Sequence, residues 1–146
     1  MNKDLYCTYD QAVALKELGF DFMCYETWKQ GITDDCTCVK VRHHTMKEGL
    51  ISACNSELAR AGTNEITTPS LAMAAKWLRE FKNIEVVVEP RFSNYKNIGY
   101  DWVIFDDFSG DYALRAPLPF SKTYEEALSS CITEAIKLVK ENSSIQ

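Results

Sequence analysis

Glycine is scarce in this chain, with six residues among 146. The glycine-containing motifs that cradle phosphates or position a serine nucleophile are absent, namely G-x-x-x-x-G-K-S/T, G-x-G-x-x-G and G-x-S-x-G. The zinc motif H-E-x-x-H is absent too. These absences argue against the common NTPases, dinucleotide enzymes and hydrolases. We therefore expect no cofactor and no catalytic residue. The absences favour a protein that is not an enzyme, and they leave a rare class of enzyme open.

Long apolar segments are also missing. No run approaches the roughly 18–20 apolar residues of a membrane-spanning helix. Residues 1–5 lead into polar sequence and lack the apolar region of a signal peptide. We therefore expect no membrane association and a location in the cytoplasm, where the six cysteines remain thiols.

Positive charge is in the minority, with 16 Lys and Arg against 21 Asp and Glu. The resulting net charge of −5 and pI of about 5.1 argue against a general nucleic-acid-binding protein, because neutralising phosphates requires clustered cations. The acidic balance is compatible with a basic partner, and it is equally explained by solubility alone.

The composition is that of a globular protein, with 46% hydrophobic and 25% charged residues. A chain of 146 residues fits one domain, and no linker or repeat interrupts it. We expect a single domain over residues 1–146 with a frayed tail over residues 143–146.

The first half carries one well-marked helix. Thr8 and Gln11 form a capping box, and Gly19 suits the position just past the helix end, so we expect a helix over residues 9–18. Beyond it we expect a loop that packs aromatic side chains over residues 20–36, a strand over residues 38–44 and a short helix over residues 47–60.

Residues 67–142 are the best-defined part of the sequence. Thr68 as N-cap and Pro69 in the first turn predict a helix that ends near residues 82–83. Thr123 and Glu126 form a second capping box that opens the last helix.

Three strands are expected between these two helices, over residues 84–89, 98–106 and 112–116. Pro90 should end the first strand, and a polar loop over residues 91–97 should follow. Residues 102–105 are apolar on both faces, so the second strand should be central. The short connections predict an α+β fold, in which a small antiparallel sheet of three to four strands packs against helices and the C-terminal unit runs α-β-β-β-α.

A group of metal-ligating residue types lies in the middle segment. Cys36, Cys38, His43 and His44 are zinc-ligand types, but their spacing is not that of two separate knuckles. The alternative interpretation is ordinary thiols and edge-strand histidines. A thiol nucleophile would also need a lowered pKa and a nearby base, which no pattern here supplies.

The expected loop over residues 91–97 mixes cations with aromatic side chains. Arg91, Phe92, Tyr95 and Lys96 form the candidate binding site, because such mixtures grip peptides or stack on ligands. Tyr100 and Trp102 continue the same aromatic pattern into the next strand and are more simply core residues, whereas Arg91, Tyr95 and Lys96 should be exposed in the loop.

Several stretches together carry a resemblance. They are residues 11–24, the pattern P-S-L-x-x-A-x-x-W-L-R-E-F from Pro69, G-Y-D-W from Gly99 and T-Y-E-E-A-L from Thr123. In these stretches the chain resembles small hypothetical proteins of phages and prophages of gut Bacteroidales. The resemblance implies a phage or mobile element in a bacterial cytoplasm, and it carries no activity or catalytic residue.

The resulting hypothesis is a non-enzymatic binding protein that modulates a host protein. One alternative is a protein that sequesters a small ligand or nucleotide against host defence, and another is a metal-dependent or thiol enzyme. A homo-oligomer is compatible with each hypothesis.

Overall fold

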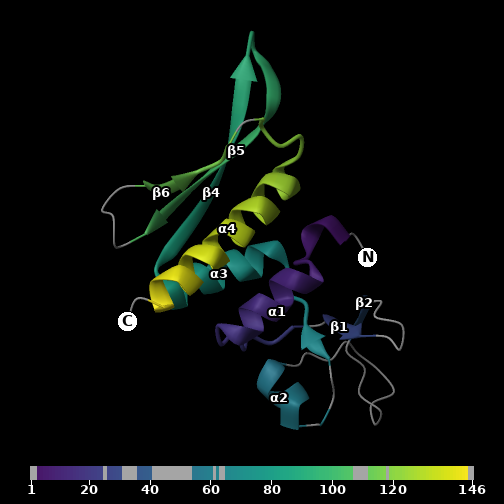
Figure 1. Ribbon diagram of the computed structural model, residues 1–146. Coiled ribbons are helices and arrows are strands. Elements are labelled where there is room, and N and C mark those ends of the chain that lie inside the picture. The colour runs from purple at the N-terminus through teal and green to yellow at the C-terminus, as the bar shows by residue number, and fades with distance from the viewer. Residues whose placement is uncertain are drawn as a thin grey trace. The chain divides into compact units, whose positions relative to one another are not determined.

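The computed structural model in Figure 1 describes residues 3–24, 26–30, 36–40, 54–60, 62, 65–106, 112–117 and 119–144. Contacts divide the chain into two compact units, one comprising Tyr6–Ser70 and the other Leu71–Gln146 with Met1–Leu5. Each unit has its own sheet and its own helices. The single domain over residues 1–146 stays a prediction.

The unit that contains the C-terminus is built on a three-stranded sheet in the order β4-β5-β6, with both pairs antiparallel. Its elements are η1 (Lys3–Leu5), α3 (Leu71–Lys82), β4 (Ile84–Ser93), β5 (Lys96–Asp106), β6 (Tyr112–Arg115) and α4 (Tyr124–Ser144). The α+β class, the antiparallel sheet packed against helices and the α-β-β-β-α order are therefore confirmed. The central position of β5 is confirmed as well.

One face of this sheet packs against α4, which lies across it in Figure 1. Residues that pair across a ladder have their side chains on the same face of the sheet. Val86 therefore shares a face with its partner Ile104, and Val88 with its partner Trp102. The facing side of α4 is apolar and buried: Ala127, Cys131, Ile132, Ala135, Ile136 and Val139. Burial of these apolar side chains is the main force that holds α4 on the sheet.

Two predictions about β4 were wrong. The strand continues through Pro90 to Ser93, and the expected loop over residues 91–97 is instead a continuation of the hairpin. Pro90 is tolerated because an outer strand has one side on which no ladder hydrogen bond is required. The true turn is only two residues long, Asn94 and Tyr95.

The starts of the two helices in this unit differ in how well they were predicted. Thr123 caps α4 as expected, with its Oγ1 accepting from Glu126 N at 3.1 Å, whereas the Glu126 carboxylate accepts from Lys122 N and not from Thr123. The predicted N-cap at Thr68 was wrong, because α3 begins at Leu71.

The Tyr6–Ser70 unit contains a second antiparallel sheet in the order β2-β1-β3. Its elements are α1 (Tyr9–Glu17), β1 (Glu26–Gln30), β2 (Cys36–Lys40), α2 (Asn55–Arg60) and β3 (Ile66–Thr67). The capping box at the start of α1 is confirmed, with Gln11 N donating to Thr8 Oγ1 at 3.2 Å and Thr8 N donating to Gln11 Oε1 at 2.8 Å. Gly19 follows the helix with a φ of 97°.

The middle of the chain was the least well predicted. The expected loop over residues 20–36 contains β1, and β3 was not expected at all. The strand expected at residues 38–44 is β2, which begins two residues earlier, and residues 41–44 lie outside the described residues. The expected helix over residues 47–60 includes α2, while residues 47–53 lie outside them. In the described part of the chain, no helix has the length and apolar character needed to cross a membrane.

Candidate functional site

The tip of the β4–β5 hairpin is a tight turn with an unusual residue in it. Ser93 pairs with Lys96, and the two turn residues between them, Asn94 and Tyr95, have φ values of 49° and 65°. Positive φ at both positions is the signature of a type I′ turn, which favours Asn at the first position and Gly at the second. Tyr95 therefore holds a backbone conformation that a bulky side chain rarely adopts.

Residues 91–99, which we call the arm, expose apolar side chains to solvent. The exposed fractions are 103% for Tyr95, 64% for Phe92 and 54% for Ile98. In Figure 1 the hairpin extends beyond the start of α4. Single exposed apolar residues are ordinary, but three within seven residues on one projecting element indicate an interaction surface.

The base of the arm is hydrogen-bonded to Ser121, in the segment that precedes α4, and we call this contact the clamp. Tyr100 N donates to Ser121 O at 2.8 Å, and Ser121 N donates to Tyr100 O at 3.0 Å. Gly99 permits this close approach, because a Cβ there would lie 2.8 Å from Ser121 O and 3.0 Å from Phe120 Cβ. The φ of Gly99 is 149°, which also favours glycine.

A half-buried ion pair between Arg91 and Asp101 fixes the same base. The side chain of Asp101 is almost fully buried, and Arg91 Nε donates to its Oδ2 at 3.2 Å. Arg91 also lies 3.6 Å from the Glu89 carboxylate, and its guanidinium carbon is 5.9 Å from the Phe120 ring centre. The hydrogen bond to Asp101 raises the pKa of Arg91. The charge-assisted contact joins a residue of β4 to a residue of β5 and so fixes the base of the arm.

The predicted binding residues therefore separate into two groups. Phe92, Tyr95 and Lys96 lie on the exposed end of the arm, while Arg91 anchors its base. Sequence reasoning missed Ile98 as an exposed residue of this surface. Ile98 is the extra residue of a β-bulge, because Arg91 pairs with Gly99 while the next residue, Phe92, pairs with Asn97. The turn itself was missed because it carries Tyr where a hairpin pattern has Gly.

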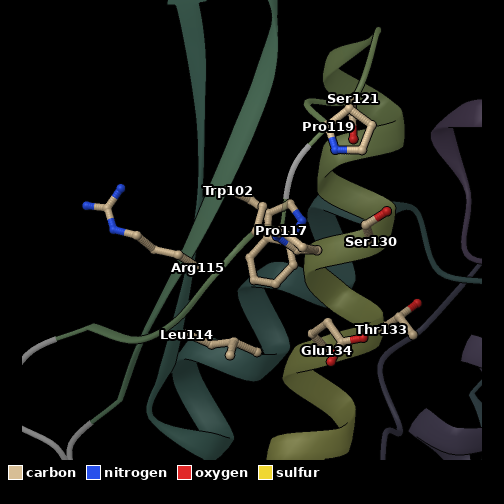
Figure 2. Close-up of a pocket in the computed structure, with 10 residues that line it drawn as sticks. Trp102, Leu114, Arg115, Pro117, Pro119, Ser121, Ser130, Thr133 and Glu134 are labelled. Carbon is tan, nitrogen blue, oxygen red and sulfur yellow. The ribbon is translucent and has the colours of Figure 1, made fainter.

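A cavity of about 600 Å³ lies between α4 and the chain that leads from β6 to Ser121. Figure 2 shows the Trp102 indole and Leu114 extending toward α4, whereas the guanidinium of Arg115 points away from it. Glu134 lines the cavity and pairs with Lys137 at 2.9 Å. Apolar and polar groups both line this cavity: Trp102, Leu114, Pro117 and Pro119, with Ser121, Ser130, Thr133 and Glu134.

Three of the described thiols, those of Cys7, Cys24 and Cys131, are held in the unreactive protonated form. Burial raises the pKa of Cys7 far above its usual range, that of Cys24 to about 11 and that of Cys131 to about 12. These groups are protonated near neutral pH, and the thiolate is the reactive form. Cys54 is a free, buried cysteine as well.

The metal candidates fall largely beyond what the structure describes. His43 and His44 lie outside the described residues, and for Cys36 and Cys38 the structure gives only the backbone of β2. Among the described side chains, no group of three or more His, Cys, Asp or Glu residues is arranged to hold a metal ion.

Among the residues that the structure describes, the arm and the cavity are two features of the C-terminal unit that suit contact with another molecule. Neither rests on a sequence motif of known chemistry. Comparison with known proteins found no matching family model, no similar curated protein and no similar solved structure.

Proposed function

We propose that this chain is a small non-enzymatic binding protein of phage or mobile-element origin, which acts in the bacterial cytoplasm and modulates a host protein by holding it with the arm. The observation that carries the proposal is Tyr95, fully exposed at the hairpin tip in a conformation that disfavours it. Strained residues cluster at functional sites, where the rest of the structure holds them in place.

The chemistry of the arm suits recognition of a protein surface. Tyrosine supplies a large, amphipathic contact and is among the residues that dominate binding energy at interfaces. The clamp at Ser121 and the Arg91–Asp101 pair order the arm before binding, which lowers the entropy lost on association.

The charge of the arm indicates which kind of partner it suits. Residues 91–99 contain two cations and no acidic residue, in a chain whose net charge is −5. Arg91 is already paired with Asp101, so Lys96 is the exposed cation of the arm. The matching partner has an apolar pocket for Tyr95 with an acidic residue at its rim.

Site-specific crosslinking tests this proposal. A photoreactive amino acid at position 95 should crosslink one host protein in a Bacteroidales lysate, while the same group at Lys140, an exposed position on α4, should not. Tyr95→Gly should reduce capture at least tenfold in a pull-down, and Lys76→Ala, on the exposed side of α3, should leave it unchanged. Equal capture by the wild-type chain and Tyr95→Gly would count against the arm.

The cavity beside Trp102 favours a second candidate function, the sequestration of a small ligand. Its volume of about 600 Å³ falls within the range of small-molecule sites. Arg115 also lines the cavity, but its guanidinium is directed away from α4, and Glu134 places a carboxylate on the α4 side. A neutral ligand therefore fits better than a nucleotide with its phosphates.

Mass spectrometry of the denatured protein tests this second candidate. A small molecule should be released from the wild-type chain and lost from Ser130→Trp, which fills the cavity from α4. Glu141→Trp places the same side chain at an exposed position of α4 outside the cavity and should retain the ligand. Protein purified from infected cells without any bound molecule would contradict sequestration.

A further inference from the structure

The cavity beside Trp102 contains a buried hydrogen-bond donor that the fold does not use. The side chain of Trp102 is 4% exposed, and its indole extends toward α4 in Figure 2. Among the described residues, no group accepts a hydrogen bond from Trp102 Nε1. A buried indole N–H usually has an acceptor, and the less buried Trp28 has one, because its Nε1 donates to Cys7 O at 3.2 Å. Trp102 therefore offers its N–H to a molecule in the cavity.

The backbone of β5 holds the Trp102 side chain in this place. Trp102 pairs with Val88 of β4, and its C=O accepts from Ala116 N at 3.0 Å on the other side. A residue that is fixed on both sides loses little freedom when a ligand binds. The donor is therefore positioned before binding.

The opposite wall of the cavity, on α4, supplies acceptors. The Glu134 carboxylate accepts hydrogen bonds and, when ionised, donates none. Lys137 Nζ lies 2.9 Å from its Oε1, which balances the negative charge and leaves Oε2 for a ligand. The Thr133 hydroxyl donates to Ser129 O at 3.2 Å, so its proton is already used. This wall suits a ligand that donates a hydrogen bond.

Apolar rings line the rest of the cavity. They are the indole of Trp102 and the rings of Pro117 and Pro119. A flat ring makes its largest contact by stacking on an indole. Because Lys137 already balances Glu134, a cation has no advantage here, and a phosphate would meet the carboxylate. These walls together favour a planar, neutral ligand with an acceptor for Trp102 and a donor for Glu134.

We propose that the cavity binds neutral, planar cyclic amides, the class to which uracil and its nucleoside belong. A ring C=O accepts from Trp102 Nε1, and a ring N–H donates to Glu134 Oε2. Uracil has such groups on opposite sides of one ring, so a single ring can satisfy both walls. This inference rests on the sequestration proposed above and names the class of its ligand.

Nitrogen–proton NMR spectra of the full chain test the Trp102 contact. The three tryptophans give three indole signals, and Trp102→Phe identifies the signal of Trp102. Uracil, added to roughly 10 mM because so small a molecule binds weakly, should shift the Trp102 signal and leave that of Trp28 in place. Uracil methylated on both ring nitrogens keeps its carbonyls and loses its N–H donors. It should bind at least tenfold more weakly, because the acceptor of Glu134 is then left unpaired.

The role of the Glu134 carboxylate is tested by charge selectivity. The wild-type chain should bind uridine at least tenfold more tightly than uridine monophosphate. Glu134→Gln should reduce this preference at least threefold. Glu141→Gln removes the same charge at an exposed position of α4 outside the cavity and should keep the preference. Ser130→Trp, which fills the cavity, should abolish binding of uracil and uridine.

Three results would overturn the ligand class: no shift of the Trp102 signal with uracil, equal affinities for uracil and its methylated form, or a preference unchanged in Glu134→Gln. Mass spectrometry of the released molecule reports on sequestration separately. A released molecule without an amide would overturn the class and leave sequestration standing. An empty protein from infected cells that binds uracil in the titration would contradict sequestration and leave the class standing.

Discussion

Tyr95 shows most clearly how a single residue works against local structure. It occupies the turn position at which glycine is favoured, and its side chain is fully exposed, so the folded chain gains no burial from it. A residue that costs stability without contributing to packing is expected where binding requires it.

Replacement of Tyr95 by glycine should therefore stabilise the protein. The variant carries the Asn-Gly pair that type I′ turns prefer, and it removes a strained φ of 65°. We expect the free energy of unfolding to rise by about 1 kcal/mol, measured by urea denaturation. A loss of stability would show that Tyr95 makes contacts within the fold.

Gly99 is the opposite case, a residue that the fold requires. Alanine at this position would place its Cβ 2.8 Å from Ser121 O at a φ of 149°. We expect Gly99→Ala to lower the free energy of unfolding by about 2–3 kcal/mol. Gly19→Ala is the matched control, since it adds a strained φ but meets no atom within 4 Å, and it should cost less.

At the scale of elements, the helix α2 depends on a side chain far away in sequence. Asp21 accepts from Ser56 N and from Ser56 Oγ, both at 2.7 Å, at the start of the helix. Desolvation by neighbouring atoms opposes ionisation, but the hydrogen bonds from Ser56, together with contributions from Cys54 and Arg60, outweigh it and lower the pKa of Asp21. A carboxylate at a helix start also interacts favourably with the helix dipole.

This cap predicts a pH dependence. A carboxyl group whose pKa is lower in the folded protein stabilises it above the unfolded pKa, about 3.9, and this stability is lost as the pH falls through the folded pKa. Asp21→Asn should therefore be less stable than the wild-type chain at pH 7, and the difference should shrink by pH 3. Urea denaturation at both pH values measures it, and an equal difference at both would contradict the role of the charge.

The elements that sequence predicted well are those with local signals. The capping residues Thr8 and Thr123 marked two helix starts, and the apolar run at residues 102–105 marked the central strand. The strand β1 was missed because tertiary contacts define it: Thr27 is fully buried, and Trp28 Nε1 donates to Cys7 O at 3.2 Å.

The candidate site was only half predictable for a related reason. The composition of residues 91–97 suggested exposed aromatic residues, and Phe92 and Tyr95 are exposed. The Arg91–Asp101 pair, the clamp at Ser121 and the cavity beside Trp102 depend on the register of the sheet and the path of the chain after β6. No local pattern encodes these features.

At the scale of the whole molecule, the C-terminal unit places two candidate binding features on one sheet. The arm projects beyond the start of α4, and the cavity lies between α4 and the chain that leads from β6 to Ser121. A partner held by the arm would leave the cavity open, so Tyr95→Gly and Ser130→Trp should test the two functions independently.

The most direct test of the arm as the binding surface is a comparison of affinity and stability in one variant. Once crosslinking has identified the partner, titration calorimetry should give a Kd at least tenfold weaker for Tyr95→Gly than for the wild-type chain, while thermal denaturation of the same samples should show an equal or higher Tm. An unchanged Kd for a variant that is at least as stable as the wild-type chain would contradict the account.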